Sequence, residues 1–151
     1  MRLESSARYG HATTSRAGQV AHAILRIGAG LLFMQHGVQK LFGWLGGMDG
    51  EGASAELFSL MGLAGVLETF GGLAIVLGVL TRPVALVLAV EMISAYFMAH
   101  QPQGGFPIQN GGELALLYAL VWIYFLTHGA GIASIDSRLG RRENTPGGYT
   151  L

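Results

Sequence analysis

Five side chains that can carry a charge or exchange a proton lie in or beside apolar stretches of this sequence: His36, Lys40, Glu68, His100 and Glu113. His36 and Lys40 are four residues apart, so in a helix they share a face. Histidine and carboxyl groups are well suited to moving protons near neutral pH, because burial and neighbouring charges tune them. These residue types therefore predict proton transfer and the binding of polar groups in apolar surroundings.

The composition shows what those surroundings are. Of 151 residues, 12% are charged and 51% are hydrophobic, whereas about 25% of the residues in a soluble domain are charged. Nine basic residues balance nine acidic ones, which argues against a nucleic-acid-binding protein. The sequence has no cysteine, which excludes a disulfide scaffold and a thiol oxidoreductase, and we expect no metal centre. The sparse charge indicates a membrane protein in contact with a lipid bilayer.

Three apolar stretches have the length of a transmembrane helix. About 20 apolar residues cross the ~30 Å core of a bilayer, and residues 60–81, 83–99 and 114–133 each contain at most one Asp, Glu, Lys or Arg. An earlier stretch is long enough but carries Arg26, His36 and Lys40, so we interpret it as a helix whose polar groups face protein. The sequence predicts an all-α integral membrane bundle of four transmembrane helices. Their expected positions are 20–45, 58–81, 83–100 and 112–133, between polar tails at 1–19 and 134–151.

The basic residues predict the orientation of the bundle. Seven of the nine lie before the first helix, between the second and third, or after the fourth: Arg2, Arg8, Arg16, Arg82, Arg138, Arg141 and Arg142. The other two connections contain no Lys or Arg. Because basic residues favour the cytoplasmic side, we expect both termini in the cytoplasm and the five side chains above in the outer half of the bilayer.

Structural explanations also exist for these polar residues. Lys40 can extend to the outer headgroups, and His100 and Glu113 can be interfacial. Arg26 is expected to pair with Glu91, because pairing reduces the cost of burying either charge. Glu68 needs a partner or a proton at its depth, and a residue of this kind is a functional candidate by default.

The histidines raise one further hypothesis. His36 and His100 share the outer depth, and His22 and His128 share the inner depth, so two layers could each hold a haem between two histidines. We rank this below the other hypotheses because His22 is close to water. A Soret band in the purified protein would be its test.

Four pieces of the sequence, in order, resemble the DoxX family. They are HGVQKLFG at 36–43, ETFGG at 68–72 with LGVLTR at 77–82 and Ala95, NGGE at 110–113, and GAGIASID at 129–136. The resemblance runs from about Arg26 to Asp136 and implies a four-helix, multi-pass protein of the bacterial inner membrane. It brings no haem.

The resemblance also implies a function, because relatives include a membrane subunit of a thiosulfate:quinone oxidoreductase. We expect a subunit of a membrane oxidoreductase or respiratory complex that meets a quinone in the outer half of the bilayer and receives electrons from a partner. Proton-handling residues would be His36, Glu68, His100 and Glu113. Groups around the quinone would be Gln39 and Lys40 at a carbonyl, with Phe33, Phe42, Trp44 and Tyr96 beside the ring.

Two alternatives stay open. The chain could be a non-catalytic structural or assembly subunit of a larger membrane complex, with the polar residues holding the bundle together. It could also carry a small acidic or neutral molecule, although the sequence shows no broken helix at the midplane. Expected protein partners are other membrane subunits or a second copy of the chain, and whether it is an enzyme stays open.

Overall fold

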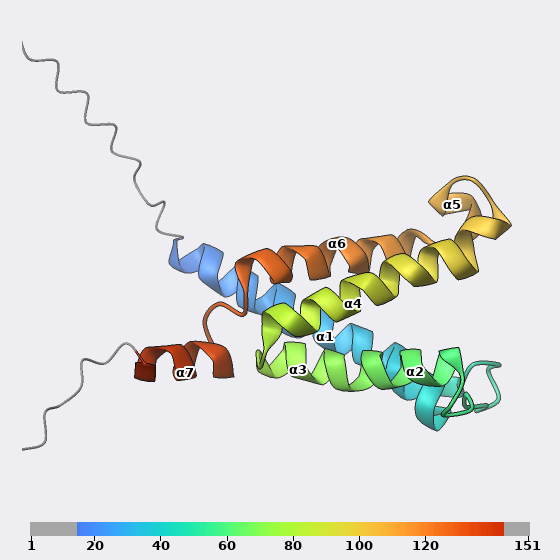
Figure 1. Ribbon diagram of the computed structural model, residues 1–151, viewed down its shortest axis with the longest axis horizontal. Coiled ribbons are helices and arrows are strands. Elements are labelled where there is room, and N and C mark those ends of the chain that lie inside the picture. The colour runs from blue at the N-terminus through green and yellow to red at the C-terminus, as the bar shows by residue number, and fades with distance from the viewer. Residues whose placement is uncertain (1–14, 144–151) are drawn as a thin grey trace, which may run out of the picture.

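The computed structural model describes residues 15–143, and this part of the chain contains helices and turns but no strand. Its α-helices are α1 (Arg16–Phe42), α2 (Leu60–Val66), α3 (Gly72–Leu77), α4 (Thr81–Ala95), α5 (Pro107–Asn110), α6 (Glu113–His128) and α7 (Ile135–Glu143). The 3₁₀ turns are η1 (Trp44–Gly46) and η4 (Gln101–Gln103), and the π-helical turns are η2 (Leu67–Gly71) and η3 (Tyr96–His100). The elements form an elongated bundle with α7 towards one end and α5 at the other (Figure 1). The all-α prediction is confirmed, and we name the two ends after these helices.

Three continuous helices in the described part are long and apolar enough to cross a membrane. They are α1 with 27 residues, Leu60–Leu77 with 18 and Thr81–Gln103 with 23. The second joins α2, η2 and α3, and the third joins α4, η3 and η4. Helix α6 is also apolar but has 16 residues, about 24 Å at the standard rise.

The predicted helix boundaries differ from the observed ones mainly near the α7 end. The helix expected at 112–133 stops at His128, because Gly129 and Gly131 adopt positive φ angles of 74° and 67°. Helix α1 begins at Arg16, so residues 16–19 do not belong to a tail. The remaining tail residues, 1–14 and 144–151, lie outside the described part of the chain.

The long helices pack as two pairs. Helix α1 lies along α2, η2 and α3, while α4 lies along α6 (Figure 1). Small residues let the second pair approach closely: Ala85 and Ala89 of α4 and Ala115 and Ala119 of α6 are buried. The core is built from large apolar side chains that include Phe33, Ile75, Leu88, Trp122 and Phe125.

Arg26 is fully buried near the α7 end, and its partners are backbone carbonyls. Its Nη1 donates to the oxygens of Ile75 (2.9 Å) and Val76 (2.8 Å), and its Nη2 donates to that of Ala133 (2.7 Å). The last carbonyls of a helix carry partial negative charge and lack partners within the helix. The predicted pair of Arg26 with Glu91 is therefore wrong, since Glu91 lies ten residues, about 15 Å, into α4.

The segment after residue 134, expected as a polar tail, contains the helix α7 (Ile135–Glu143). The carboxylate of Asp136 in α7 accepts hydrogen bonds from the backbone N–H groups of Leu80 (2.8 Å) and Thr81 (2.9 Å). The Asp136 N–H donates to the oxygen of Gly78 (2.9 Å). Leu80 has a left-handed φ of 48°, and Asp136 thus caps the start of α4 directly after a tight turn.

The loop after α1 is held by its own backbone at the α5 end. The Asp49 carboxylate accepts hydrogen bonds from the N–H groups of Ala53 (3.0 Å) and Glu51 (2.9 Å). These bonds hold the pKa of Asp49 below its ordinary value. The Ala55 N–H donates to the oxygen of Lys40 (2.7 Å), so the loop fixes the last turn of α1.

We expect Asp136→Ala to lower the free energy of unfolding by about 1 to 2 kcal/mol, because two N–H groups at the start of α4 lose their acceptor. Circular dichroism during denaturant unfolding in mild detergent measures the change. Arg138→Ala, an exposed position of the same helix, is the control and should change stability by less than about 0.5 kcal/mol. Equal losses in both variants would contradict the capping role.

Candidate functional site

A partly buried ion pair joins Lys40 of α1 to Glu68 of η2. The Lys40 Nζ lies 2.6 Å from Oε1 and 2.5 Å from Oε2 of Glu68. The side chain of Glu68 is 4% exposed and that of Lys40 is 22% exposed. Both carboxylate oxygens are thus occupied by one ammonium group, which offsets much of the cost of burying either charge.

A glycine on α1 makes this contact possible. A Cβ atom on Gly37 would collide with the backbone nitrogen and the hydroxyl of Thr69 and lie 2.8 Å from the carbonyl carbon of Glu68. Helix α1 therefore meets the π-helical turn η2 almost backbone to backbone. Single π-helical turns are rare and often occur at functional sites, and η2 carries both Glu68 and Thr69. Gly37 sets the separation at which Lys40 reaches Glu68.

A second carboxyl group, that of Glu91 in α4, borders the pair. Both of its oxygens are buried and have no hydrogen-bond partner among the described residues. The charges of Glu68 and Lys40 are near enough to act on it, and Leu88, almost one turn earlier, lies beside Gly71 of η2. Sequence reasoning assigned Glu91 to Arg26 and missed this site. The sequence feature that could have revealed it is the tight turn at 78–80. Glu68 lies ten residues before this turn and Glu91 lies eleven residues after it, so the two side chains lie at a similar level on neighbouring helices.

His36 and Tyr118 complete the group. The ring of His36 lies edge-on to Tyr118 of α6, with 6.2 Å between the centroids. The charge of Lys40 acts on His36, and that of Glu68 acts on Tyr118. Tyr118 also stacks on Trp122 at 5.7 Å. We call Lys40, Glu68, Glu91, His36 and Tyr118 the polar cluster.

The structure does not bring the other two predicted proton carriers into contact with the cluster. The Nδ1 of His100 lies 3.1 Å from the backbone oxygen of Asn110, and it must donate there because a carbonyl only accepts. His100 is nine residues beyond Glu91, about 13 Å along the helix. Glu113 is exposed at the first position of α6. Both lie at the α5 end, beyond the cluster.

The residues predicted to contact a quinone lie in different parts of the structure. Gln39 is half-buried on α1, next to Lys40 in the chain. Trp44 is 62% exposed and packs on Phe42 at 5.2 Å, as interfacial aromatic side chains do. Tyr96 is buried beneath Gly112, where a Cβ would lie 2.7 Å from its ring. Phe33 is in the core, in contact with Tyr118 at 4.9 Å.

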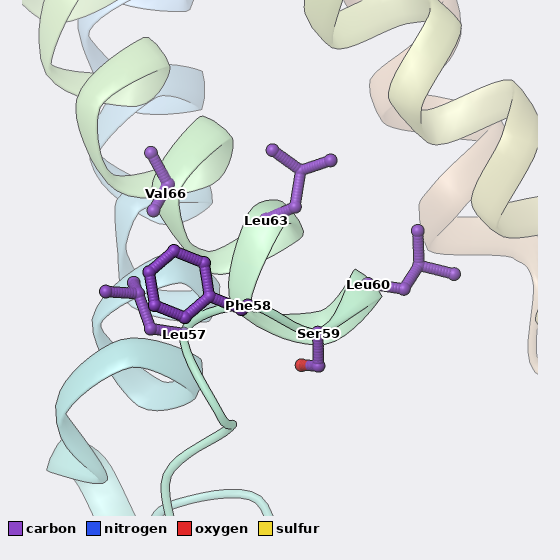
Figure 2. Close-up of a pocket in the computed structure, with 6 residues that line it drawn as sticks. All are labelled: Leu57, Phe58, Ser59, Leu60, Leu63 and Val66. Carbon is purple, nitrogen blue, oxygen red and sulfur yellow. The ribbon is translucent and has the colours of Figure 1, made fainter.

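Two shallow apolar depressions lie on the helices towards the α5 end. One, of about 530 Å³, is formed by Leu57, Phe58, Ser59, Leu60, Leu63 and Val66. Figure 2 shows these side chains around the start of α2, with a single hydroxyl among them. The other, of about 580 Å³, is formed by Pro107, Glu113, Leu114, Leu116, Leu117 and Leu120. Surfaces of this composition suit hydrocarbon chains.

The histidines at the α7 end are engaged with other groups. The Nε2 of His22 donates to the oxygen of Gly129 (3.1 Å), so its Nδ1 accepts from the hydroxyl of Tyr124 (2.9 Å) when the ring is neutral. The Nδ1 of His128 lies 3.0 Å from the oxygen of Tyr124. A haem between His22 and His128 would have to displace a bond of His22. In the part of the chain that the structure describes, no three His, Asp or Glu side chains gather as a metal site.

We expect Gly37→Ala to destabilise the protein by about 1 to 3 kcal/mol, because the added methyl collides with the backbone of η2. Gly28→Ala is the matched control in the same helix, since a Cβ there has nothing within 4 Å. Helix propensity makes the control neutral or stabilising by up to about 1 kcal/mol. The free energy of unfolding in detergent measures both, and similar values would contradict the close approach.

Comparison with known proteins places this architecture in a family. Residues 21–101 match the profile of the DoxX family. An uncharacterized protein of Haemophilus influenzae is 41% identical over 124 residues, which cover 80% of this chain and 91% of that protein. An uncharacterized membrane protein of Mycobacterium tuberculosis is 31% identical over 137 residues, which cover 82% and 83%. No solved structure matches. The profile covers more than half of the chain, and the chain belongs to the DoxX family of membrane proteins.

Proposed function

We propose that the chain is a four-span subunit of the bacterial inner membrane that handles quinone at the polar cluster. One observation carries this proposal. The Glu68 end of the Lys40–Glu68 ion pair is buried between apolar helices. It is bordered by the buried carboxyl oxygens of Glu91, which have no hydrogen-bond partner among the described residues. Ionisable groups inside a membrane are costly, and they mark proton relays and substrate pathways.

The charges support a definite orientation. Arg16 starts α1, Arg82 lies in the first turn of α4 and Arg138 lies in α7, so all three are near the α7 end. Asp49 and Glu51 occupy the loop at the α5 end. Basic residues favour the cytoplasmic side. We therefore propose that α6 is the fourth span, that both termini are cytoplasmic and that the cluster lies in the outer half of the bilayer.

The residues present fit a quinone head group. A quinone bound here would supply two-electron redox chemistry, in which a partner subunit provides the electrons and two protons are taken up at the carbonyl oxygens. The Lys40 ammonium can donate a hydrogen bond to a carbonyl oxygen, and His36 can hold and release a proton. Glu68 fixes the position of Lys40 through both of its oxygens. The apolar depressions near the α5 end offer surface for a hydrocarbon tail.

A second function is favoured by the geometry of the pair itself. Because Lys40 neutralises Glu68 and joins α1 to η2, the pair could serve only to hold the bundle together in a structural subunit. Replacing a buried ion pair by apolar residues of similar size is often neutral or stabilising, whereas removing one partner costs about 3 to 5 kcal/mol. The two functions therefore predict different behaviour of single and double variants.

We expect Glu68→Leu alone to destabilise the protein strongly and the double variant Lys40→Met with Glu68→Leu to regain most of that loss. The double variant should nevertheless bind decylubiquinone at least tenfold more weakly, about 1.4 kcal/mol, because it lacks the ammonium donor. Isothermal titration in mild detergent measures the affinity. Glu51→Gln, in the exposed loop, is the control. Wild-type affinity in a folded double variant would contradict the quinone site and favour the structural function.

The orientation has its own test. Reporters fused after residue 151 should be active if they require the cytoplasm, and reporters fused after residue 110 should be active if they require the periplasm. The reverse pattern, or the same side for both positions, would contradict a chain with four spans and cytoplasmic termini.

A further inference from the structure

We propose that Glu91 is the proton-carrying residue of the polar cluster. The inference deepens the proposed function, because that function supplies the group that exchanges the proton. The protonation of Glu91 itself does not require a bound quinone.

The contrast between the two carboxyl groups is the first observation. Both oxygens of Glu68 are bonded by the Lys40 ammonium. Both oxygens of Glu91 are buried, and no donor among the described residues reaches them. An isolated carboxylate away from water is far more costly than a neutral carboxyl. Of the two carboxyl groups, that of Glu91 is therefore the one that must carry a proton to be buried.

The charges around Glu91 also favour its protonated form. The titratable groups that face it or lie next to its neighbours are Glu68 from η2, Lys40 and His36 from α1, and Tyr118 from α6. Lys40 and Glu68 cancel each other, so an ionised Glu91 would leave one uncompensated negative charge beside another carboxylate.

Arg26, the buried arginine that could have balanced Glu91, is bonded to carbonyls near the α7 end. Among the described residues, Lys40 is thus the single cation whose charge acts on Glu91. When the O–H bond of Glu91 breaks and its proton passes to an acceptor oxygen, the new carboxylate has this ammonium nearby. One ammonium shared by two carboxyls lets the site hold one proton and release it.

Infrared spectroscopy of the purified full-length protein in detergent tests the proposal without a ligand. A protonated carboxyl has a carbonyl stretch separate from the bands of carboxylates. We expect this band in the wild type, a matching loss in Glu91→Gln, and no loss in Ser94→Ala, an exposed position on the same helix. A band that is unchanged in Glu91→Gln would overturn the proposal.

Labelling with dicyclohexylcarbodiimide locates the proton. This apolar reagent reacts with carboxyls that carry a proton, and peptide mapping by mass spectrometry identifies the residue. We expect an adduct on Glu91 and not on Glu68, with labelling that decreases as the pH rises. In Lys40→Met we expect Glu68 to be labelled as well, because it has lost its ammonium. An adduct on wild-type Glu68 in place of Glu91 would overturn the proposal.

These results separate the two proposals. The band and the adduct on Glu91 require no quinone, so they can be obtained even where decylubiquinone does not bind. In that case the quinone function fails while the proton-carrying residue stands. Quinone binding without either signal from Glu91 would leave the function and remove this inference.

Discussion

The structure depends on one constraint, which is that lipid offers no partner to a charge or a backbone polar group. Each charge in the apolar part of the chain must therefore be satisfied by protein. Arg26 is satisfied by backbone carbonyls near the α7 end, and Lys40 and Glu68 satisfy each other. Each arrangement needs a glycine: Gly37 lets α1 approach the backbone of η2, and Gly78 leaves room for the guanidinium of Arg26. Only after these assignments does Glu91 emerge as a buried carboxyl that stays without a partner among the described residues.

The parts of the fold that follow from average composition could be predicted from the sequence. Long apolar runs specify helices of membrane length, and the four-residue spacing of His36 and Lys40 places them on one face of a helix. Glu68 could be singled out because a carboxyl in an apolar run must have a partner or a proton. Each of these rules concerns a single helix, and within single helices their predictions agree with the structure.

The errors concern contacts between helices. Their opposite charges suggested an ion pair between Arg26 and Glu91. The sequence does not reveal that backbone carbonyls at the end of α3, which lack partners within the helix, bind the guanidinium. The polar segment expected as a tail contains α7, and its role depends on a contact that the sequence does not show, that of Asp136 with the start of α4. The segments 77–82 and 129–136, which resemble the DoxX family, form much of the contact between α7 and the start of α4. These segments therefore specify the architecture and not the chemistry.

We propose that the polar cluster between α1, η2 and α4 receives the head group of a quinone. Crosslinking with a photoreactive short-chain quinone, followed by peptide mapping, tests it most directly. We expect adducts on the segments that contain His36 to Lys40, Glu68 and Glu91, and we expect excess decylubiquinone to suppress them. Adducts confined to exposed side chains such as Phe97 and Leu120, unaffected by that excess, would contradict it.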